Sequence, residues 1–244
     1  MGAEIRLGRT SLWLDPTGAL WWERRRMLVV ADLHLEKGAA FARRGSMLPP
    51  YDTPSTLGRL EALVGRHRPA TVVSLGDGFH DRRGGEALDK GSAGRIRALT
   101  GAVRWLWVAG NHDPAPPAGL GGEAVASFEM DGIGFGHVPG ALPGLEVAGH
   151  LHPKARLSGE GRAVTRPCFV ADPVRLILPA FGAFAGGLDV LDPAISGLFG
   201  KGFDAFLLGR DRVFRVPHHR LGPLAWPERS VARSARADRL VRNP

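Results

Sequence analysis

The chain has 244 residues, of which 44% are hydrophobic and 23% charged, with a formal net charge of +8 at pH 7 and a single cysteine. The lone Cys168 excludes an intramolecular disulfide, and no apolar run of about 18 residues exists that could span a membrane. The positive charge favours a polyanionic partner such as nucleic acid, although an arginine-rich composition also fits a GC-biased genome. The charged N-terminus lacks the apolar stretch of a signal peptide, so we expect a cytoplasmic protein.

The apolar content is sufficient for one α/β domain, which we place at residues 1–222, followed by a basic tail at residues 223–244. The tail carries five arginines against one glutamate and one aspartate. We expect residues from about 228 onward to be poorly ordered without a partner and to add phosphate contacts, with an inert solvated extension as the alternative.

The first half of the domain predicts a hairpin and then alternating strands and helices. Asp15-Pro16-Thr17-Gly18 is a turn signal between the apolar runs 12–14 and 19–22, whose tryptophans we expect in the core. Strands are predicted at 27–31, 71–75 and 103–109, and helices at 55–67 and 94–99. This alternation is typical of βαβ units in a parallel sheet, where ligands bind beyond the carboxyl ends of the strands.

The pattern changes after residue 113. Residues 114–122 are rich in Pro and Gly and predict a loop. Short apolar runs separated by turns follow, and they predict a second sheet built from residues 126–130, 133–138, 145–148, 162–165, 174–178, 203–208 and 213–216.

Four polar motifs occur in the order Asp32-Leu33-His34, Gly76-Asp77, Gly110-Asn111-His112-Asp113 and Gly149-His150-Leu151-His152, and the first three each follow a predicted strand. Carboxylate and amide oxygens with imidazole nitrogens suit Mn²⁺, Fe or Zn²⁺ better than Mg²⁺ or Ca²⁺. Each motif alone is more often part of a turn than of a metal site. Their occurrence together at strand ends, however, predicts a two-metal site. Two such ions activate a bridging water and offset phosphoryl charge, so we expect phosphoester hydrolysis.

Some candidates depend on weaker signals. His137 is expected to complete the ligand set, although a histidine between Gly and Val is often a core residue. His150 and His152 are expected at a turn of the second sheet, and their spacing would point both imidazoles the same way only in extended backbone. We consider His80, Arg82 and Lys37 for substrate contact, with ordinary polar loop residues as the alternative.

The motif set resembles the calcineurin-like metallophosphoesterase superfamily over residues 27 to about 152. The resemblance implies a four-layer αββα sandwich. It also implies that His112, beside Asp113, protonates the leaving group or contacts the phosphate, which makes this pair the catalytic candidates. Finally, it implies two divalent metal ions, one held by Asp32, His34 and His152 and the other by Asn111, His137 and His150, with Asp77 bridging them.

A narrower resemblance, to about Leu191, is carried by residues 34–41, 48–50, 149–153 and 178–188. These segments look like the PdeM subfamily of ligase-associated DNA damage response endonucleases. That subfamily implies an Mn²⁺-dependent nuclease acting on DNA, with single strands the expected form, and an association with an ATP-dependent DNA ligase, a nuclease and a helicase. One departure is Glu36, which stands where the resemblance implies a glycine and places a carboxylate near the site.

Together these features predict a two-metal phosphodiesterase, a DNA endonuclease of DNA repair in which a metal-bridging hydroxide attacks the phosphodiester. One alternative is a small-molecule or nucleotide phosphatase or phosphodiesterase, which would need a closed pocket instead of an open basic groove. A second alternative is a DNA-binding scaffold with a structural metal site. The presence of His112 and a full ligand set argue against the scaffold.

Overall fold

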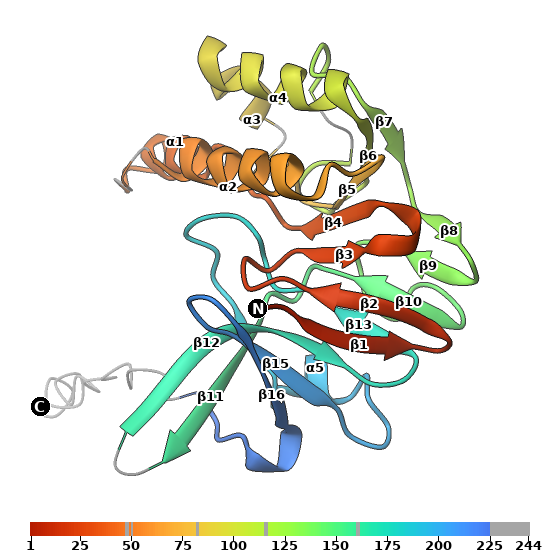
Figure 1. Cartoon of the computed structure of the whole chain (residues 1–244). Coiled ribbons are helices and arrows are strands. Elements are labelled where there is room, and N and C mark those ends of the chain that lie inside the picture. Colours follow the sequence, from red (N-terminus) through yellow and green to blue (C-terminus); the bar gives the residue numbers. More distant parts are fainter. Residues whose placement is uncertain (47–48, 50, 82, 115–116, 160–161, 225–244) are drawn as a thin grey trace, which may run out of the picture.

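The computed structural model describes residues 1–46, 49, 51–81, 83–114, 117–159 and 162–224. Two β-sheets pack against each other, and helices cover the outer face of the first sheet (Figure 1). Of the predicted basic tail, only residues 223 and 224 fall in this range, so the expectations for residues 228–244 lie outside the described residues. Within the described ranges, no helix is long and apolar enough to cross a membrane.

The first sheet has seven strands in sequential order, antiparallel up to the fourth strand and parallel from there on. The parallel arrangement predicted for the strands at 27–31, 71–75 and 103–109 is thereby confirmed. The strands are β1 (Ala3–Leu7), β2 (Thr10–Leu14), β3 (Leu20–Trp22), β4 (Met27–Ala31), β5 (Thr71–Leu75), β6 (Arg104–Val108) and β7 (Glu123–Val125).

The tryptophans of the N-terminal hairpin do not all lie in the core as expected. Trp22 is buried between the sheets, where its ring stacks on Phe135 with centroids 6.2 Å apart. Trp13 is 39% exposed because successive side chains of a strand point to opposite faces, and Leu12 and Leu14 occupy the inner face of β2. The added strand β1 pairs with β2 and continues this alternation.

Helices cover the outer face of the first sheet. They are α1 (Lys37–Arg43), α2 (Asp52–His67), α3 (Gly84–Ala87) and α4 (Lys90–Ala102), with a short 3-10 turn, η1 (Glu23–Arg25), before β4. The predicted helices at 55–67 and 94–99 correspond to α2 and α4, which both begin earlier. Asp89 explains the start of α4, because its side chain accepts a hydrogen bond from the main-chain N–H of Ser92.

The second sheet has nine strands in the order β14-β11-β12-β13-β10-β9-β8, with β15 paired to β12 and β16 to β15. The predicted strand at 126–130 is only partly correct, since β8 begins at Phe128. The strands are β8 (Phe128–Met130), β9 (Ile133–Phe135), β10 (Leu145–Ala148), β11 (Pro153–Gly159), β12 (Arg162–Ala171), β13 (Arg175–Ile177), β14 (Leu188–Asp189), β15 (Asp204–Leu208) and β16 (Val213–Pro217).

Three apolar clusters separate the layers. One lies between the two sheets, and a second lies between the first sheet and its helices. The third packs Ile195 of α5 (Pro193–Ser196) with Phe199 and Phe203 against the second sheet. The expected four-layer order is therefore confirmed, with an outer layer over the second sheet that consists of α5 and its flanking loop. A final 3-10 turn, η2 (His218–Arg220), follows β16.

A loop after β13 ties the two sheets together at the end of β4. Ala180 forms a parallel bridge with Ala31, and the N–H groups of Phe181 and Gly182 donate to the carbonyls of Ala31 (2.8 Å) and Asp32 (3.1 Å). A Cβ atom at residue 182 would lie 2.1 Å from the Leu33 carbonyl oxygen, so this approach requires glycine. The loop is thus fixed beside the carboxyl end of β4.

Candidate metal centre

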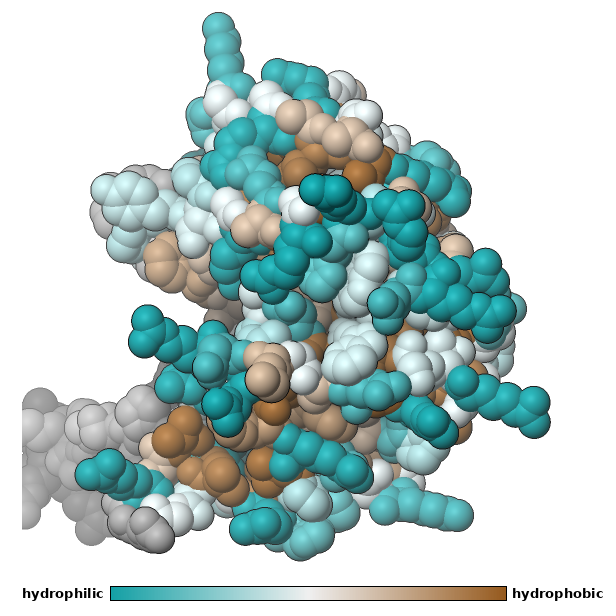
Figure 2. Space-filling model, viewed as in Figure 1, coloured by the Kyte–Doolittle hydropathy of each residue, from teal (hydrophilic) through white to brown (hydrophobic). Residues whose placement is uncertain are grey.

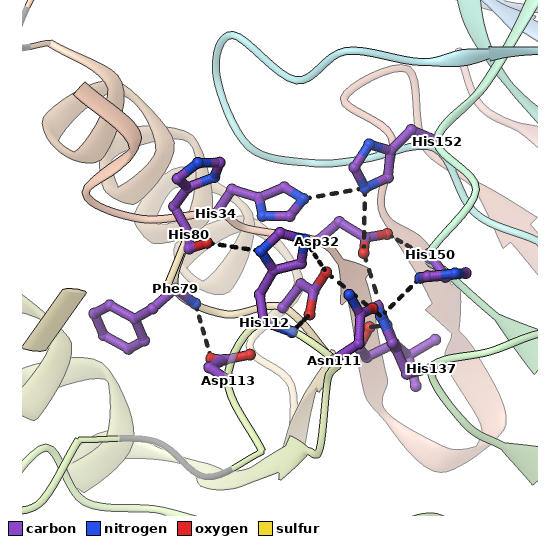
Figure 3. A network of polar contacts seen from close by, with 12 residues as sticks. Asp32, His34, Phe79, His80, Asn111, His112, Asp113, His137, His150 and His152 are labelled. Carbon is purple, nitrogen blue, oxygen red and sulfur yellow. Dashed lines mark hydrogen bonds and ion pairs between the residues drawn. The ribbon is translucent and has the colours of Figure 1, made fainter. Parts of the chain in front are cut away.

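The predicted ligands converge where the carboxyl ends of the first sheet meet loops of the second (Figure 3). From the first sheet, Asp32 and His34 follow β4, Asp77 follows β5 and Asn111 follows β6. The second sheet supplies histidines from the segments after β9 and β10, namely His137, His150 and His152. The structure therefore brings all seven predicted ligands to one place.

One group of possible ligands consists of Asp32, His34 and His152, whose ligand atoms lie within 4.8 Å of one another. The Nε2 atoms of the two histidines are 3.1 Å apart, and Nε2 of His152 lies 3.4 Å from Oδ1 of Asp32. Asp32 and His34 are buried, and the His152 side chain is 19% exposed. This group opens to solvent on the side of His152.

A second group consists of Asp77, His137 and His150, also with ligand atoms within 4.8 Å of one another. Nε2 of His137 lies 3.5 Å from Oδ2 of Asp77, 3.2 Å from Nδ1 of His150 and 2.8 Å from Oδ1 of Asn111. Its other nitrogen, Nδ1, faces the Leu75 carbonyl oxygen at 3.1 Å, which fixes the ring and directs Nε2 into the group.

Asp32 connects the two groups. Its Oδ1 lies 3.7 Å from Nδ1 of His137, and its Oδ2 accepts a 2.9 Å hydrogen bond from the main-chain N–H of His150. The pairing of Asp32, His34 and His152 matches the expected one, and Asp77 joins the histidines of the other group. The bridging role expected for Asp77 stays a prediction.

The contacts within both groups fit a pair of cations. Two imidazole nitrogens 3.1 Å apart, as in His34 and His152, can share at most one proton, whereas both lone pairs can point at one ion. Oδ1 of Asp32 is buried and has no hydrogen-bond partner among the described residues, so a carboxylate oxygen there lacks the compensation that buried charge requires. Nitrogen and oxygen donors without thiolate match Mn²⁺, Fe and Zn²⁺ alike.

The protonation equilibria of His34, His150 and Asp77 also favour ligation. Burial lowers the pKa of His34 to about 3, and burial likewise lowers the pKa of His150, so both rings are neutral donors near pH 7. Burial by itself would raise the pKa of Asp77, but hydrogen bonds from His137 and from the main chain of His112 outweigh it and bring this pKa to about 2. Neutral histidines and an ionised aspartate are the forms that bind metal.

The backbone at the site adopts an uncommon conformation. Five of the seven candidate ligands have positive φ angles: Asp32 (53°), His34 (43°), Asp77 (44°), His150 (71°) and His152 (46°). Left-handed backbone is costly outside glycine and concentrates at functional sites. His150 and His152 therefore do not lie in the extended backbone that would point both imidazoles the same way. The turn at these residues sends the two imidazoles to different groups instead of in one direction.

The two catalytic candidates lie beside the second group. The ring Nδ1 of His112 is 2.8 Å from the His80 carbonyl oxygen, and its Nε2 is 3.9 Å from Oδ2 of Asp77. Asp113 instead points away from the ligands and accepts a hydrogen bond from the Phe79 main chain at 2.8 Å. Burial raises the pKa of Asp113 to about 7. His112 thus lies beside the second ligand group, whereas Asp113 binds the main chain at Phe79.

Of the three residues considered for substrate contact, the structure describes His80 and Lys37. The His80 ring stacks against His112 with centroids 5.7 Å apart, and Nζ of Lys37 donates to the Phe184 carbonyl oxygen at 2.9 Å. Arg82 lies outside the described residues. Sequence reasoning did not identify Arg59 and Lys154, which line a cavity of about 210 Å³ next to His152. The available signal for Lys154 was its position two residues after His152, the last predicted ligand in the sequence.

Comparison with known proteins is consistent with this geometry. Residues 25–172 match the family described as calcineurin-like phosphoesterase. The crystal structure of Pseudomonas putida nuclease MPE is 27% identical, with a TM-score of 0.69 over 88% of this chain and 100% of that chain. Yfce, a phosphoesterase from E. coli, is 15% identical, with a TM-score of 0.42 over 78% of this chain and 98% of that one. No curated protein matches the chain.

Proposed function

Because the chain belongs to the calcineurin-like phosphoesterase family, and is therefore a metal-dependent hydrolase, we propose that it is a phosphodiesterase that cleaves single-stranded DNA with two Mn²⁺ ions. The observation that carries this proposal is the pair of ligand groups linked through Asp32, with His112 beside them and a cationic cleft opening from His152. The likeness to a nuclease over 88% of the chain supports the choice of substrate.

The ligand groups define what each residue does. Asp32, His34 and His152 would hold one ion, and Asp77, His137 and His150 the other, with Asn111 beside His137. When bound, the ions supply Lewis acidity toward the phosphoryl oxygens and a water that is nucleophilic at neutral pH. The contact of His137 Nδ1 with the Leu75 carbonyl oxygen holds one of these ligands in place before the substrate arrives.

His112 is the residue that would handle the proton of the leaving group. If its Nδ1–H donates to the carbonyl oxygen of His80, its Nε2 faces the site. In the imidazolium form, Nε2–H can then donate a proton to the departing oxygen. The stacked ring of His80 limits rotation of His112 about its side-chain bonds.

An open, basic cleft favours a polymer over a small molecule. The cleft beside His152 is lined by Arg59 and Lys154, and no acidic side chain among the described residues lines it. The space-filling view shows a hollow between the helical layer and the β11–β12 hairpin (Figure 2). We further propose a cytoplasmic role in DNA repair alongside an ATP-dependent ligase, a nuclease and a helicase, which is supported by the resemblance to the PdeM subfamily.

The test compares three substrates with and without Mn²⁺: bis-p-nitrophenyl phosphate, p-nitrophenyl phosphate and end-labelled single-stranded DNA. We expect Mn²⁺-dependent hydrolysis of the diester and of DNA. Hydrolysis of the monoester alone would instead identify a phosphatase. Tight DNA binding and metal binding without any hydrolysis would identify a scaffold.

A further inference from the structure

An exposed aromatic ring stands beside the cationic cleft. Phe184 is 48% exposed and lines the same 210 Å³ cavity as His152, Arg59 and Lys154. Its φ angle is 59°, a conformation that costs energy for a residue with a side chain. A large apolar side chain held at the surface in a strained backbone indicates a contact surface for a ligand, since burial in the core does not account for it.

Hydrogen bonds at three consecutive residues hold the loop that carries Phe184. The N–H of Ala183 donates to Oγ1 of Thr56 (3.1 Å), while the carbonyls of Phe184 and Ala185 accept from Nζ of Lys37 (2.9 Å) and Nζ of Lys154 (3.3 Å). These hydrogen bonds hold the loop and its ring in place, so little conformational entropy would be lost when a ligand binds to the ring.

These hydrogen bonds place the ammonium groups of Lys37 and Lys154 on neighbouring main-chain carbonyls of one loop. Burial lowers the pKa of Lys37, and the nearby charge of Lys154 lowers it further. Arg59 adds a third cation, whose Nε is buried without a hydrogen-bond partner among the described residues. Arg59 and Lys154 line the cavity with no acidic side chain among the lining residues, and Nζ of Lys37 lies at the Phe184 carbonyl beside it. These three cations are complementary to a phosphate group.

We propose that this cleft is the subsite for a nucleotide adjacent to the scissile phosphate, with its base stacked on Phe184 and its phosphate held by Lys37, Lys154 and Arg59. The inference rests on the proposed function and specifies its substrate class. A free face of a base stacks well on an aromatic ring, whereas a base in a duplex is already stacked on its neighbours. The subsite therefore selects single strands.

The binding test uses a fluorescently labelled oligonucleotide and metal-stripped protein, so that no cleavage occurs. Phe184→Ala is expected to weaken binding of the single strand about tenfold, and Phe184→Trp to restore it. An oligonucleotide with abasic sites should bind wild type and Phe184→Ala equally, which a merely structural role of the ring would not produce. Phe214→Ala is the matched control, because Phe214 is 49% exposed and does not line the cavity.

Further variants control for strain in the loop backbone and test the phosphate contacts of the lysines. Phe184→Gly relieves the left-handed backbone, so it tests the ring even if the alanine variant is destabilised. Lys37→Gln and Lys154→Gln should each reduce the slope of log affinity against log salt by about 0.7. With Mn²⁺ bound, Phe184→Ala should raise KM for single-stranded DNA about tenfold and change kcat much less.

The outcomes separate the two proposals. If wild type binds single strands through Phe184 but does not cleave them, the proposed function is wrong and the subsite stands. If wild type cleaves single strands but the Phe184 and lysine variants bind and cleave as wild type does, the subsite is wrong and the function stands. Failure of wild type to bind single strands overturns the subsite.

Discussion

The main-chain N–H of His112 donates a 2.9 Å hydrogen bond to Oδ1 of Asp77, whose other oxygen lies 3.9 Å from Nε2 of the same histidine. A candidate ligand and a candidate acid are thus held together by the backbone, independently of the imidazole. Removing the ring leaves the hydrogen bond that orients Asp77 intact. Metal binding and proton transfer can therefore be separated by mutation.

The first prediction concerns His112. His112→Ala is expected to lower turnover by about 10²- to 10⁴-fold, because proton transfer to the leaving group is lost while the orientation of Asp77 is kept. Elemental analysis should find the same metal content as in wild type. Loss of metal in this variant would reassign His112 as a ligand.

The second prediction concerns the ligands. Asp77→Asn is expected to abolish activity and lower metal content, because the amide replaces the ionised ligand of the second group. His34→Ala should be partly rescued by excess Mn²⁺, since Asp32 and His152 persist. Asp204→Asn, on β15 and paired with Arg215, serves as a control with unchanged metal content. Full activity of metal-stripped protein in chelator would contradict the mechanism.

The third prediction concerns Glu36, the residue that departs from the expected glycine. Its φ angle is 62°, at the start of α1, where a residue with a side chain costs about 1–2 kcal/mol. Glu36→Gly should raise the free energy of unfolding by about 0.5–1 kcal/mol, because the flexibility of glycine in the unfolded chain offsets part of the gain.

The comparison variant is Glu36→Ala, which removes the carboxylate but retains the left-handed backbone. In urea unfolding of metal-stripped protein, Glu36→Gly should have its midpoint at a higher urea concentration than Glu36→Ala. The reverse order would show that the carboxylate, and not the backbone, determines stability at this position.

The fourth prediction concerns pH and His67 at the end of α2. Its ring lies 4.7 Å from the Trp21 ring, and burial lowers its pKa below the usual value of 6.5, with a partial offset from Asp15. The unfolded chain therefore binds this proton at higher pH than the folded one does. The free energy of unfolding is expected to fall as pH drops below about 6.5.

His67→Phe keeps a ring against Trp21 and removes the titration. Relative to wild type, this variant should be more stable at pH 5 than at pH 8, as measured by urea unfolding with chelator present. A larger relative stability at pH 8 would reverse the sign and refute the assigned burial effect.

The ligand positions could be predicted because their signal is local. A polar residue directly after an apolar strand lies at the carboxyl edge of a parallel sheet, which locates Asp32, Asp77 and Asn111 without knowledge of the remaining chain. The division of ligands between the groups agrees with what the family resemblance implied, but it could not be deduced from the residues alone. It depends on the left-handed backbone of His150 and His152, which residue spacing does not reveal.

Other elements escaped prediction because tertiary contacts determine them. Helix α1 contains Gly38, which weakens the local helical signal. Its place is determined by Asp52, whose Oδ2 accepts a hydrogen bond from the Gly38 N–H and whose Oδ1 would lie 2.9 Å from a Cβ at this position. The role of Phe184 likewise depends on lysines far away in the sequence.

Both ligand groups take residues from both sheets, so neither half of the chain contains a local version of the site. His34 and His152 are neighbours in space but 118 residues apart in sequence. Contacts of such separation form late and slow the folding of a domain. During synthesis, the parallel strands β4 to β6 emerge before the histidines that complete the centre. Asp32, Asp77 and Asn111 therefore emerge before the histidines of the second sheet, and the centre cannot be complete until the two sheets have packed together.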